Sequence, residues 1–113
     1  MAANDYTVLA TAKAVVIARF GTIDDGELEA LLTASACTND DDETVYQPYL
    51  IAGWLMRARW QQYKSVKGAS GSTVEWANPD EAYRAMAALQ AALSKGLTCP
   101  VAWQAGTDFS VIW

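Results

Sequence analysis

The residues best suited to chemistry in this sequence are the carboxylates of an acidic stretch at 38–44, TNDDDET. Calcium in an EF-hand loop is bound by oxygen ligands at alternating positions, and three residues partly fit that spacing: Asn39, Asp41 and Glu43. The rest of the loop does not fit, because the sixth position is Thr44 rather than glycine and the twelfth is Leu50 rather than glutamate. We expect no metal here, and interpret the stretch as a solvated loop or as an acidic contact for a neighbour's arginine.

Nucleophilic and acid–base chemistry has little support in the sequence. There is no histidine, so the usual catalytic triads and dyads are excluded. The cysteines, Cys37 and Cys99, lack metal-site spacing and a histidine that would activate a thiolate. We expect two buried free thiols, with a single disulfide as the alternative. The sequence predicts no catalytic residue, no cofactor and no metal.

A basic segment follows the acidic one and is the candidate for binding nucleic acid. Residues 44–74 contain four basic residues and no acid, whereas residues 1–43 contain nine acids and two basic residues. A nucleic-acid site combines basic residues with aromatic rings on which bases can stack, and the candidates for such a site are all in this segment: Arg57, Arg59, Trp60, Tyr63, Lys64 and Lys67. The net charge of −5 opposes general attraction to nucleic acid. The asymmetry is compatible with an uneven solvated surface or with contacts between copies of the chain.

The element that positions these charges is a stretch from Glu43 to Lys67, which the pattern predicts to be one long helix. Nearly every residue from Tyr49 to Met56 is apolar, and a helix apolar on all sides is surrounded by protein or lipid. Beyond Arg57 one face continues the helical spacing: Tyr49, Gly53, Met56, Trp60 and Tyr63. Proline suits a first turn, so the regular helix should begin at Gln47 or Pro48 and end near Val66 or Lys67.

Two helices are predicted before this stretch. The first runs from Tyr6 to Arg19 and ends at Gly21, although its Val-Val-Ile run also suits a strand. The second starts at Asp24, which forms a capping box with Glu27, and runs to about Ala36.

The chain after the central helix contains a loop, another helix and a tail. Residues 67–76 form a small-residue loop that leads into a short strand or hairpin arm. A capping box at Asn78 and Glu81, with Pro79 in the first turn, predicts a helix from Pro79 to Ser94. The tail from Leu97 to Trp113 is too apolar at its end to lie in water. It is expected either to pack on its own domain, as an edge strand beside residues 73–76, or to dock on a partner.

These elements predict a mainly α-helical fold, a small bundle of about four helices with a short β-hairpin or strand arm and an extended C-terminal tail. Residues 1–96 form the helical domain, with its hairpin loop near 67–76, and residues 97–113 form a possible docking arm. No apolar run reaches the length of about 18 residues expected of a membrane span, and no signal peptide is visible. We therefore expect a protein made in the cytoplasm without a membrane partner.

Several segments together resemble a known family. They are Ala-Arg-Phe-Gly at 18–21, Asp-Asp-Gly-Glu-Leu-Glu-Ala-Leu-Leu at 24–32, the acidic spacer, and the Tyr/Ala/Trp-rich helix at 46–63. The run 63–67, its Gly/Ser loop and Val74-Glu75-Trp76 look like that family's hairpin, and the helix with Leu89-Gln90 also fits. Over residues 7 to 95 the sequence resembles the head–tail connector proteins of tailed bacteriophages, also called adaptor or head-completion proteins. The first helix is more apolar than is usual for them.

The resemblance implies a structural virion protein of the head–tail interface, made in the host cytoplasm, with no enzymatic activity. It implies a homo-oligomeric ring, commonly a dodecamer, that lies under the portal protein and supports a stopper or tail-terminator protein. DNA would pass through the channel without specific binding, because a net-negative wall does not hold phosphates. The alternative function is a small soluble helical binding or regulatory module, antitoxin-like or DNA-associated, that uses Arg57, Arg59 and Lys64 on its partner.

Two sets of contact residues are expected on the connector interpretation. Self-association would use aromatic and basic residues of the central helix together with acids of the loop: Tyr49, Trp54, Arg57, Arg59, Trp60, Asp40, Asp41 and Asp42. Docking on a portal or a neighbouring ring would use the tail and the 67–75 loop: Phe109, Val111, Ile112, Trp113, Lys67 and Ser70.

Overall fold

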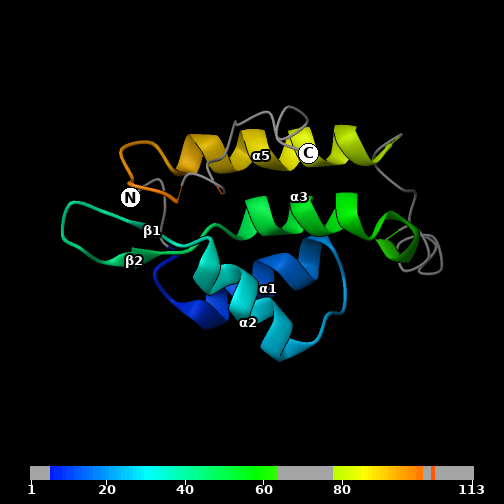
Figure 1. Ribbon diagram of the computed structural model, residues 1–113, viewed down its shortest axis with the longest axis horizontal. Helices are drawn as coiled ribbons and strands as arrows, with labels where there is room; N and C mark the ends of the chain where they lie inside the picture. Colours follow the sequence, from blue (N-terminus) through cyan, green and yellow to red (C-terminus); the bar gives the residue numbers. More distant parts are fainter. Residues whose placement is uncertain (1–5, 64–77, 101–102, 104–113) are drawn as a thin grey trace.

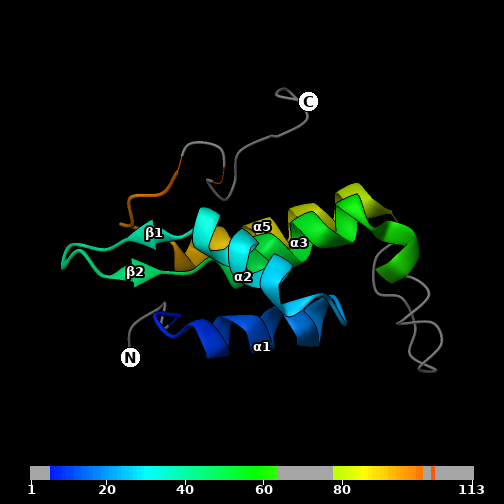
Figure 2. The ribbon, with the colours of Figure 1, turned by 60° about the horizontal axis from the view of Figure 1, so that its bottom comes forward.

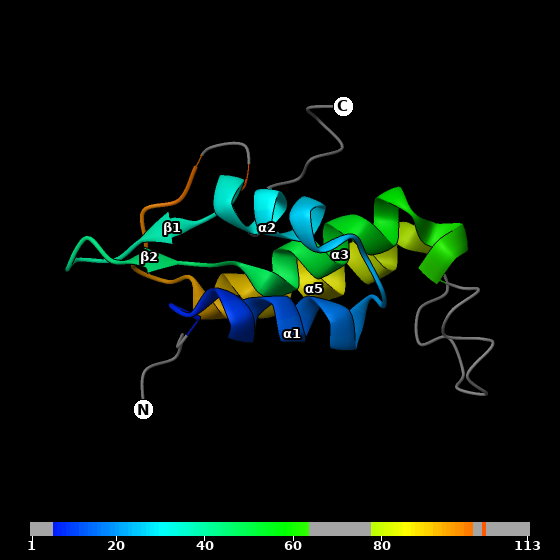
Figure 3. The same cartoon turned by 90° about the horizontal axis from the view of Figure 1, so that it is seen from below.

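The computed structural model describes residues 6–63, 78–100 and 103, and these form a mainly helical fold with a small antiparallel sheet (Figure 1). Helix α3, Pro48–Ala58, lies between α5, Pro79–Leu93, on one side and α1, Leu9–Arg19, with α2, Asp25–Ala34, on the other (Figures 1 and 3). The predicted fold class is confirmed. Within the described residues no helix is long and apolar enough to cross a membrane.

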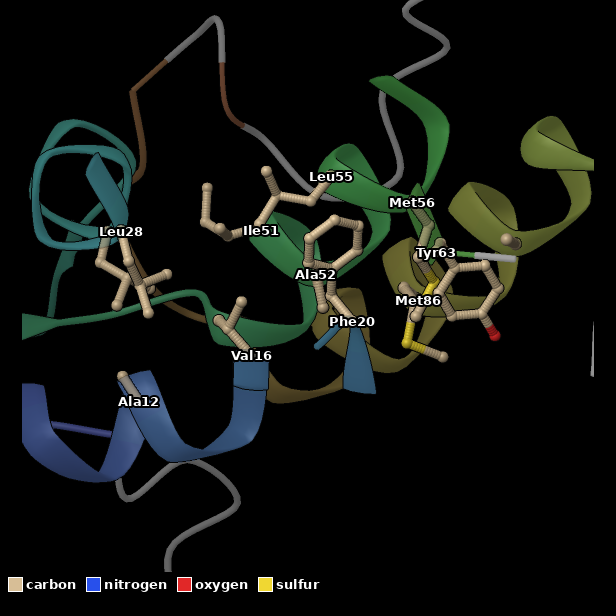
Figure 4. Packing of buried hydrophobic residues seen from close by; sticks show 12 residues of the cluster. Ala12, Val16, Phe20, Leu28, Ile51, Ala52, Leu55, Met56, Tyr63 and Met86 are labelled. Carbon is tan, nitrogen blue, oxygen red and sulfur yellow. The ribbon is translucent and has the colours of Figure 1, made fainter. Parts of the chain in front are cut away.

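The core is built around α3. Leu50, Ile51, Ala52 and Leu55 are completely buried, as expected of a helix that is apolar on all sides and covered on both flanks. Figure 4 shows side chains of α1, α2 and α5 converging on it, with those of α1 and α2 on one side and that of α5 on the other: Val16, Phe20, Leu28 and Met86. The apolar character of α3 is therefore satisfied within one copy of the chain.

Gly53 explains how α3 and α5 approach so closely. A Cβ atom at this position would lie 2.7 Å from Cβ of Met86 and 3.3 Å from the carbonyl oxygen of Tyr83. Both distances are shorter than ordinary van der Waals contact, so only glycine leaves room for α5 here.

The prediction that the regular helix begins at Gln47 or Pro48 is confirmed, because α3 begins at Pro48, but the prediction of one unbroken helix is wrong, and its predicted end near Val66 or Lys67 lies outside the described residues. The stretch begins as strand β2, Thr44–Val45, and α3 ends at Ala58. Arg59 leaves the helical conformation with φ −127° and ψ 47°, and residues 60–63 are again helical. The change of direction places the ring of Tyr63 in a stacked arrangement 6.4 Å from that of Phe20. No glycine or proline marks the break, so tertiary packing overrides a continuous helical pattern.

The predicted helix starts and ends are largely confirmed. Oδ2 of Asp24 accepts a hydrogen bond from the N–H of Glu27 at 3.0 Å, and Oδ1 of Asn78 accepts one from the N–H of Glu81 at 2.8 Å. Helix α1 forms where a strand was the alternative, and Gly21 follows it with a φ of 125°, which favours glycine. Helices α1 and α2 are shorter than predicted, because α1 begins at Leu9 and α2 ends at Ala34.

The acidic stretch contains the expected exposed loop, at residues 39–43, but two short strands that were not predicted flank this loop and make the whole a β-hairpin. Strand β1, Cys37–Thr38, pairs with β2 so that Cys37 lies opposite Val45 and Thr38 opposite Thr44. Oδ1 of Asn39 accepts hydrogen bonds from the N–H groups of Asp41 at 2.9 Å and Glu43 at 3.0 Å, which holds the turn. The side chain of Asn39 therefore stabilises the turn by bonding to the backbone, whereas the sequence analysis had expected this stretch to be a solvated loop.

The described part of the tail packs on its own domain. Thr38 and Thr98 exchange two backbone hydrogen bonds, of 2.8 and 2.9 Å, in an antiparallel bridge. Cys37 and Cys99 form a disulfide, so the expectation of two free thiols is wrong. Figures 1 and 2 show this segment on the side of α3 away from α1. The predicted hairpin arm at 67–76 and the tail from 104 onward lie outside the described residues, as does the proposed pairing between them.

Candidate interaction surface

Tyr49, the first residue predicted to join copies of the chain, is tied into its own subunit. Its hydroxyl lies 3.2 Å from that of Tyr6, and the guanidinium carbon of Arg19 lies 5.4 Å from the centre of its ring. The backbone N–H of Tyr49 donates a hydrogen bond to Oε1 of Gln90 at 3.0 Å. The half-buried ring therefore joins α1 to α3 and leaves only part of its surface for a neighbour.

The two arginines of the set are both ion-paired within the subunit. Nε of Arg57 lies 3.2 Å from Oδ1 of Asp80, and its guanidinium carbon lies 5.4 Å from the ring centre of Tyr83. Nη1 of Arg59 lies 2.7 Å from Oε1 of Glu27. The hydrogen bond from Arg59 lowers the pKa of Glu27, and the same bond raises the pKa of Arg59. Both cations thus join helices of one copy.

The two tryptophans of the set are half-buried and belong to the edge of the core. The ring of Trp54 lies 5.8 Å from that of Trp103, and the ring of Trp60 lies 5.4 Å from that of Tyr63. Trp54 therefore anchors the described part of the tail. Trp60 supports the segment that follows the break at Arg59.

The acids of the set stand apart from the arginines. Asp40, Asp41 and Asp42 are exposed at the turn between β1 and β2. In Figure 1 this hairpin extends from one end of the molecule, and α3 finishes towards the other end, where Arg57 and Arg59 lie. The structure does not bring the predicted acidic and basic partners together within a subunit. The residues predicted to dock on a portal or a neighbouring ring all lie outside the described residues: Lys67, Ser70, Phe109, Val111, Ile112 and Trp113.

An exposed apolar surface on α1 was missed by the sequence analysis. Val8, at the start of the helix, is 55% exposed, and Ile17, near its end, is 47% exposed. The residues between them on the outer side are small and uncharged: Ala10, Thr11 and Ala14. A surface helix normally carries polar and charged residues on this side. The excess of apolar residues in the first helix was the available signal.

The outer side of α5 has a smaller surface of the same kind. Leu89 is 44% exposed, and Ala88 and Ala92 are exposed beside it. Arg84 and Lys95, also exposed, lie at either end of these three residues, and neither has an ion-pair partner among the residues that the structure describes. The acids of α5 are confined to its first turn, at Asp80 and Glu81.

A buried group of amide and hydroxyl side chains links four segments and was also missed. Nε2 of Gln47 donates to the carbonyl oxygens of Ser35 and Trp103, both at 2.7 Å. Nε2 of Gln90 donates to Oγ of Ser94 at 3.0 Å. Gln47 and Gln90 are completely buried. A single glutamine has no sequence pattern that would predict its burial. The hydrogen bonds of Gln47 and Gln90 have a structural explanation, because buried polar groups require partners.

Metal-binding side chains do not gather in the part of the chain that the structure describes, where no group of three or more is close enough to hold an ion. The candidate functional features among the described residues are therefore the exposed apolar surfaces of α1 and α5.

No known protein family matches this chain. Searches of curated proteins and of solved structures likewise find no match.

Proposed function

We propose that this chain is a structural subunit that assembles with copies of itself, as a ring between the portal and the tail or stopper of a tailed bacteriophage. The observation that carries the proposal is the uncharged outer side of α1, with Val8 and Ile17 about half exposed. Val8 and Ile17 lie at the two edges of this uncharged side, and a continuous apolar surface is a candidate site of association in a soluble protein. The resemblance to head–tail connector proteins supplies the kind of assembly.

The helical order on which the resemblance rests supports the proposal further. An α1 that ends before Gly21, an α2 capped by Asp24, a buried α3 and an α5 capped by Asn78 occur in the expected sequence. A net charge of −5 suits a subunit that lets DNA pass, because it offers the phosphates little attraction.

The disulfide bears on where the protein works. Thiols stay reduced in the cytoplasm, whereas disulfides persist in oxidising surroundings. On the proposed role, Cys37 and Cys99 are thiols during assembly. They lose two protons and two electrons to an oxidant such as dissolved oxygen when the particle is released. The bond then fixes the β-hairpin to the start of the tail.

The alternative, a small binding or regulatory module, is less well supported. It relies on Arg57 and Arg59 as contacts for a partner, and both already pair with acids of their own subunit. The third residue of that interpretation, Lys64, lies outside the described residues.

Solution mass tests the proposal directly. Light scattering at several protein concentrations, followed by negative-stain imaging with and without portal-bearing heads, should show rings, either free or formed on the portal. A discrete dimer that ignores portal-bearing heads and binds duplex DNA with a steep salt dependence would contradict the connector role and favour the regulatory alternative.

A further inference from the structure

The large apolar side chains that are exposed in the described residues occur on two helices only. Ile17 belongs to α1, Val8 is the cap residue immediately before that helix, and Leu89 belongs to α5. The buried sides of both helices face α3, which lies between them, so their exposed sides face away from each other (Figure 1). One copy of the chain therefore presents an apolar surface on each of two opposite sides.

Both surfaces are built for close approach of another helix. On α1 the outer side carries Ala10, Thr11 and Ala14 between the two larger residues, and on α5 Ala88 and Ala92 flank Leu89. Small side chains let helix axes come within about 8–10 Å, the separation of packed helices. The charged residues of α1, Lys13 and Arg19, lie outside this surface in contacts with α2 and with Tyr49.

The net charges beside the two surfaces are of opposite sign, because Asp24, Asp25 and Glu29 outnumber the two cations of α1, Lys13 and Arg19, although Lys13 pairs with two of these acids. Beside α1 lies α2, with Asp24 as its cap and Asp25 and Glu29 on the side that faces Lys13. At either end of the α5 surface are Arg84 and Lys95, which have no ion-pair partner within the described residues. Ile17 follows Lys13 by one helical turn, so it lies on the same side as these acids. Complementary charges at the rim favour pairing of the two surfaces with each other rather than of either with itself.

We propose that the exposed side of α1 in one copy of the chain packs against the exposed side of α5 in the next copy. This inference rests on the proposed self-association, but not on the phage role. Because the two surfaces differ and lie on opposite sides, each contact leaves one surface open at either end. Repetition of the contact closes a ring when the rotation between copies allows it.

Two substitutions block one surface each. Ile17→Lys places a cation on α1 opposite Arg84 and Lys95 of the neighbour, and Leu89→Glu places an anion on α5 opposite the neighbour's acids. Ala30→Lys, at an exposed position of α2 outside both surfaces, is the matched control. Circular dichroism and thermal unfolding establish that each variant folds, which is expected because all three side chains are exposed.

The decisive measurement is the mass of an equimolar mixture of the two blocked variants. Each variant alone should be monomeric at concentrations where wild type and Ala30→Lys assemble. In the mixture, the intact α5 of Ile17→Lys meets the intact α1 of Leu89→Glu. The mixture should therefore give a heterodimer of twice the monomer mass that cannot grow further.

Other outcomes would overturn the inference in recognisable ways. A dimer formed by Leu89→Glu alone, with no heterodimer in the mixture, would show that α1 pairs with α1 across a twofold axis. Rings formed by both folded variants would place the contact elsewhere and leave the proposed function standing. A wild-type protein that stays monomeric at every concentration and on portal-bearing heads would instead remove the proposed function itself.

Discussion

Gln90, on α5, caps α3. Its Oε1 accepts a hydrogen bond from the backbone N–H of Tyr49 at 3.0 Å, in the first turn of a helix whose own cap residue, Gln47, makes no side-chain capping bond. The first N–H groups of a helix lack partners within it, and a side-chain acceptor commonly comes from the preceding residue. Here the acceptor comes from another helix, so α3 is capped only when α5 is in place.

Replacement of this cap should destabilise the fold. Gln90→Leu keeps the side-chain bulk and leaves the N–H of Tyr49 without its acceptor, which costs about 1–3 kcal/mol in a buried setting. Urea unfolding followed by circular dichroism measures the change. Gln61→Leu, the same substitution at an exposed site, should alter stability by no more than about 0.5 kcal/mol. Equal effects at the two sites would show that the cap does not matter.

The close approach at Gly53 makes a second prediction. Gly53→Ala inserts a methyl group 2.7 Å from Cβ of Met86, and should lower the free energy of unfolding by about 1–3 kcal/mol through overpacking. Gly26→Ala is the matched control, because its Cβ would lie 3.4 Å from Oδ2 of Asp24 in an exposed helix. That variant should gain about 0.5–1 kcal/mol, since alanine favours helix more than glycine. A stabilising effect at both positions would contradict the described contact between α3 and α5.

The disulfide predicts a marked effect of reducing agent. Cys37 and Cys99 are 62 residues apart, and the chain-entropy model gives such a bond about 4 kcal/mol of stabilisation. Thermal unfolding with and without dithiothreitol should differ for the wild type. The Cys37→Ser, Cys99→Ser double variant should behave like the reduced wild type and ignore the reductant. Titration of two free thiols in the native, unreduced protein would disprove the bond.

The ion pair between Arg59 and Glu27 predicts a dependence of stability on pH. The pKa of Glu27 is lowered in the folded protein, so the carboxylate stabilises the fold above its ordinary pKa, and the contribution is lost as the pH falls through the lowered value. Glu27→Gln should thus be less stable than wild type at neutral pH, and the difference should shrink as the pH falls below the ordinary pKa of a glutamate, about 4.3. Urea midpoints measured from pH 7 to pH 3 give the comparison, and a difference that stays constant over this range would rule out a role for the pair.

Local signals in the sequence were sufficient for the fold class and for the starts of α2, α3 and α5, but not for the start of α1, which is Leu9 rather than Tyr6. The capping bonds of Asp24 and Asn78 each join residues only three positions apart, so the chain chemistry that makes them can be recognised without tertiary structure. The apolar run of α3 similarly required a buried location, whatever surrounded it. The hairpin at 37–45 was missed because the amide of Asn39, rather than a glycine turn, holds it.

The sequence shows the chemical type of each predicted contact residue, but it does not show whether that residue is free to contact another copy of the chain. Arg57 and Arg59 were recognised as the basic residues of the central helix, but their partners, Asp80 and Glu27, are distant in the chain. The hydrophobic pattern indicated α3 as the helix that needs neighbours on every side. In the structure α1, α2 and α5 are those neighbours. The outer side of α1 became the candidate only when the structure showed which helix lies between the others.

The sequence by itself determined where α2, α3 and α5 begin, that the fold is mainly helical and that α3 must be buried, because these follow from interactions over a few residues and from hydrophobic periodicity. Tertiary structure alone decided the disulfide between Cys37 and Cys99, the cap that Gln90 gives to α3 and the end of α3 at Arg59. Each of these depends on segments that meet only after folding, and no local pattern specifies which distant partner a side chain will reach.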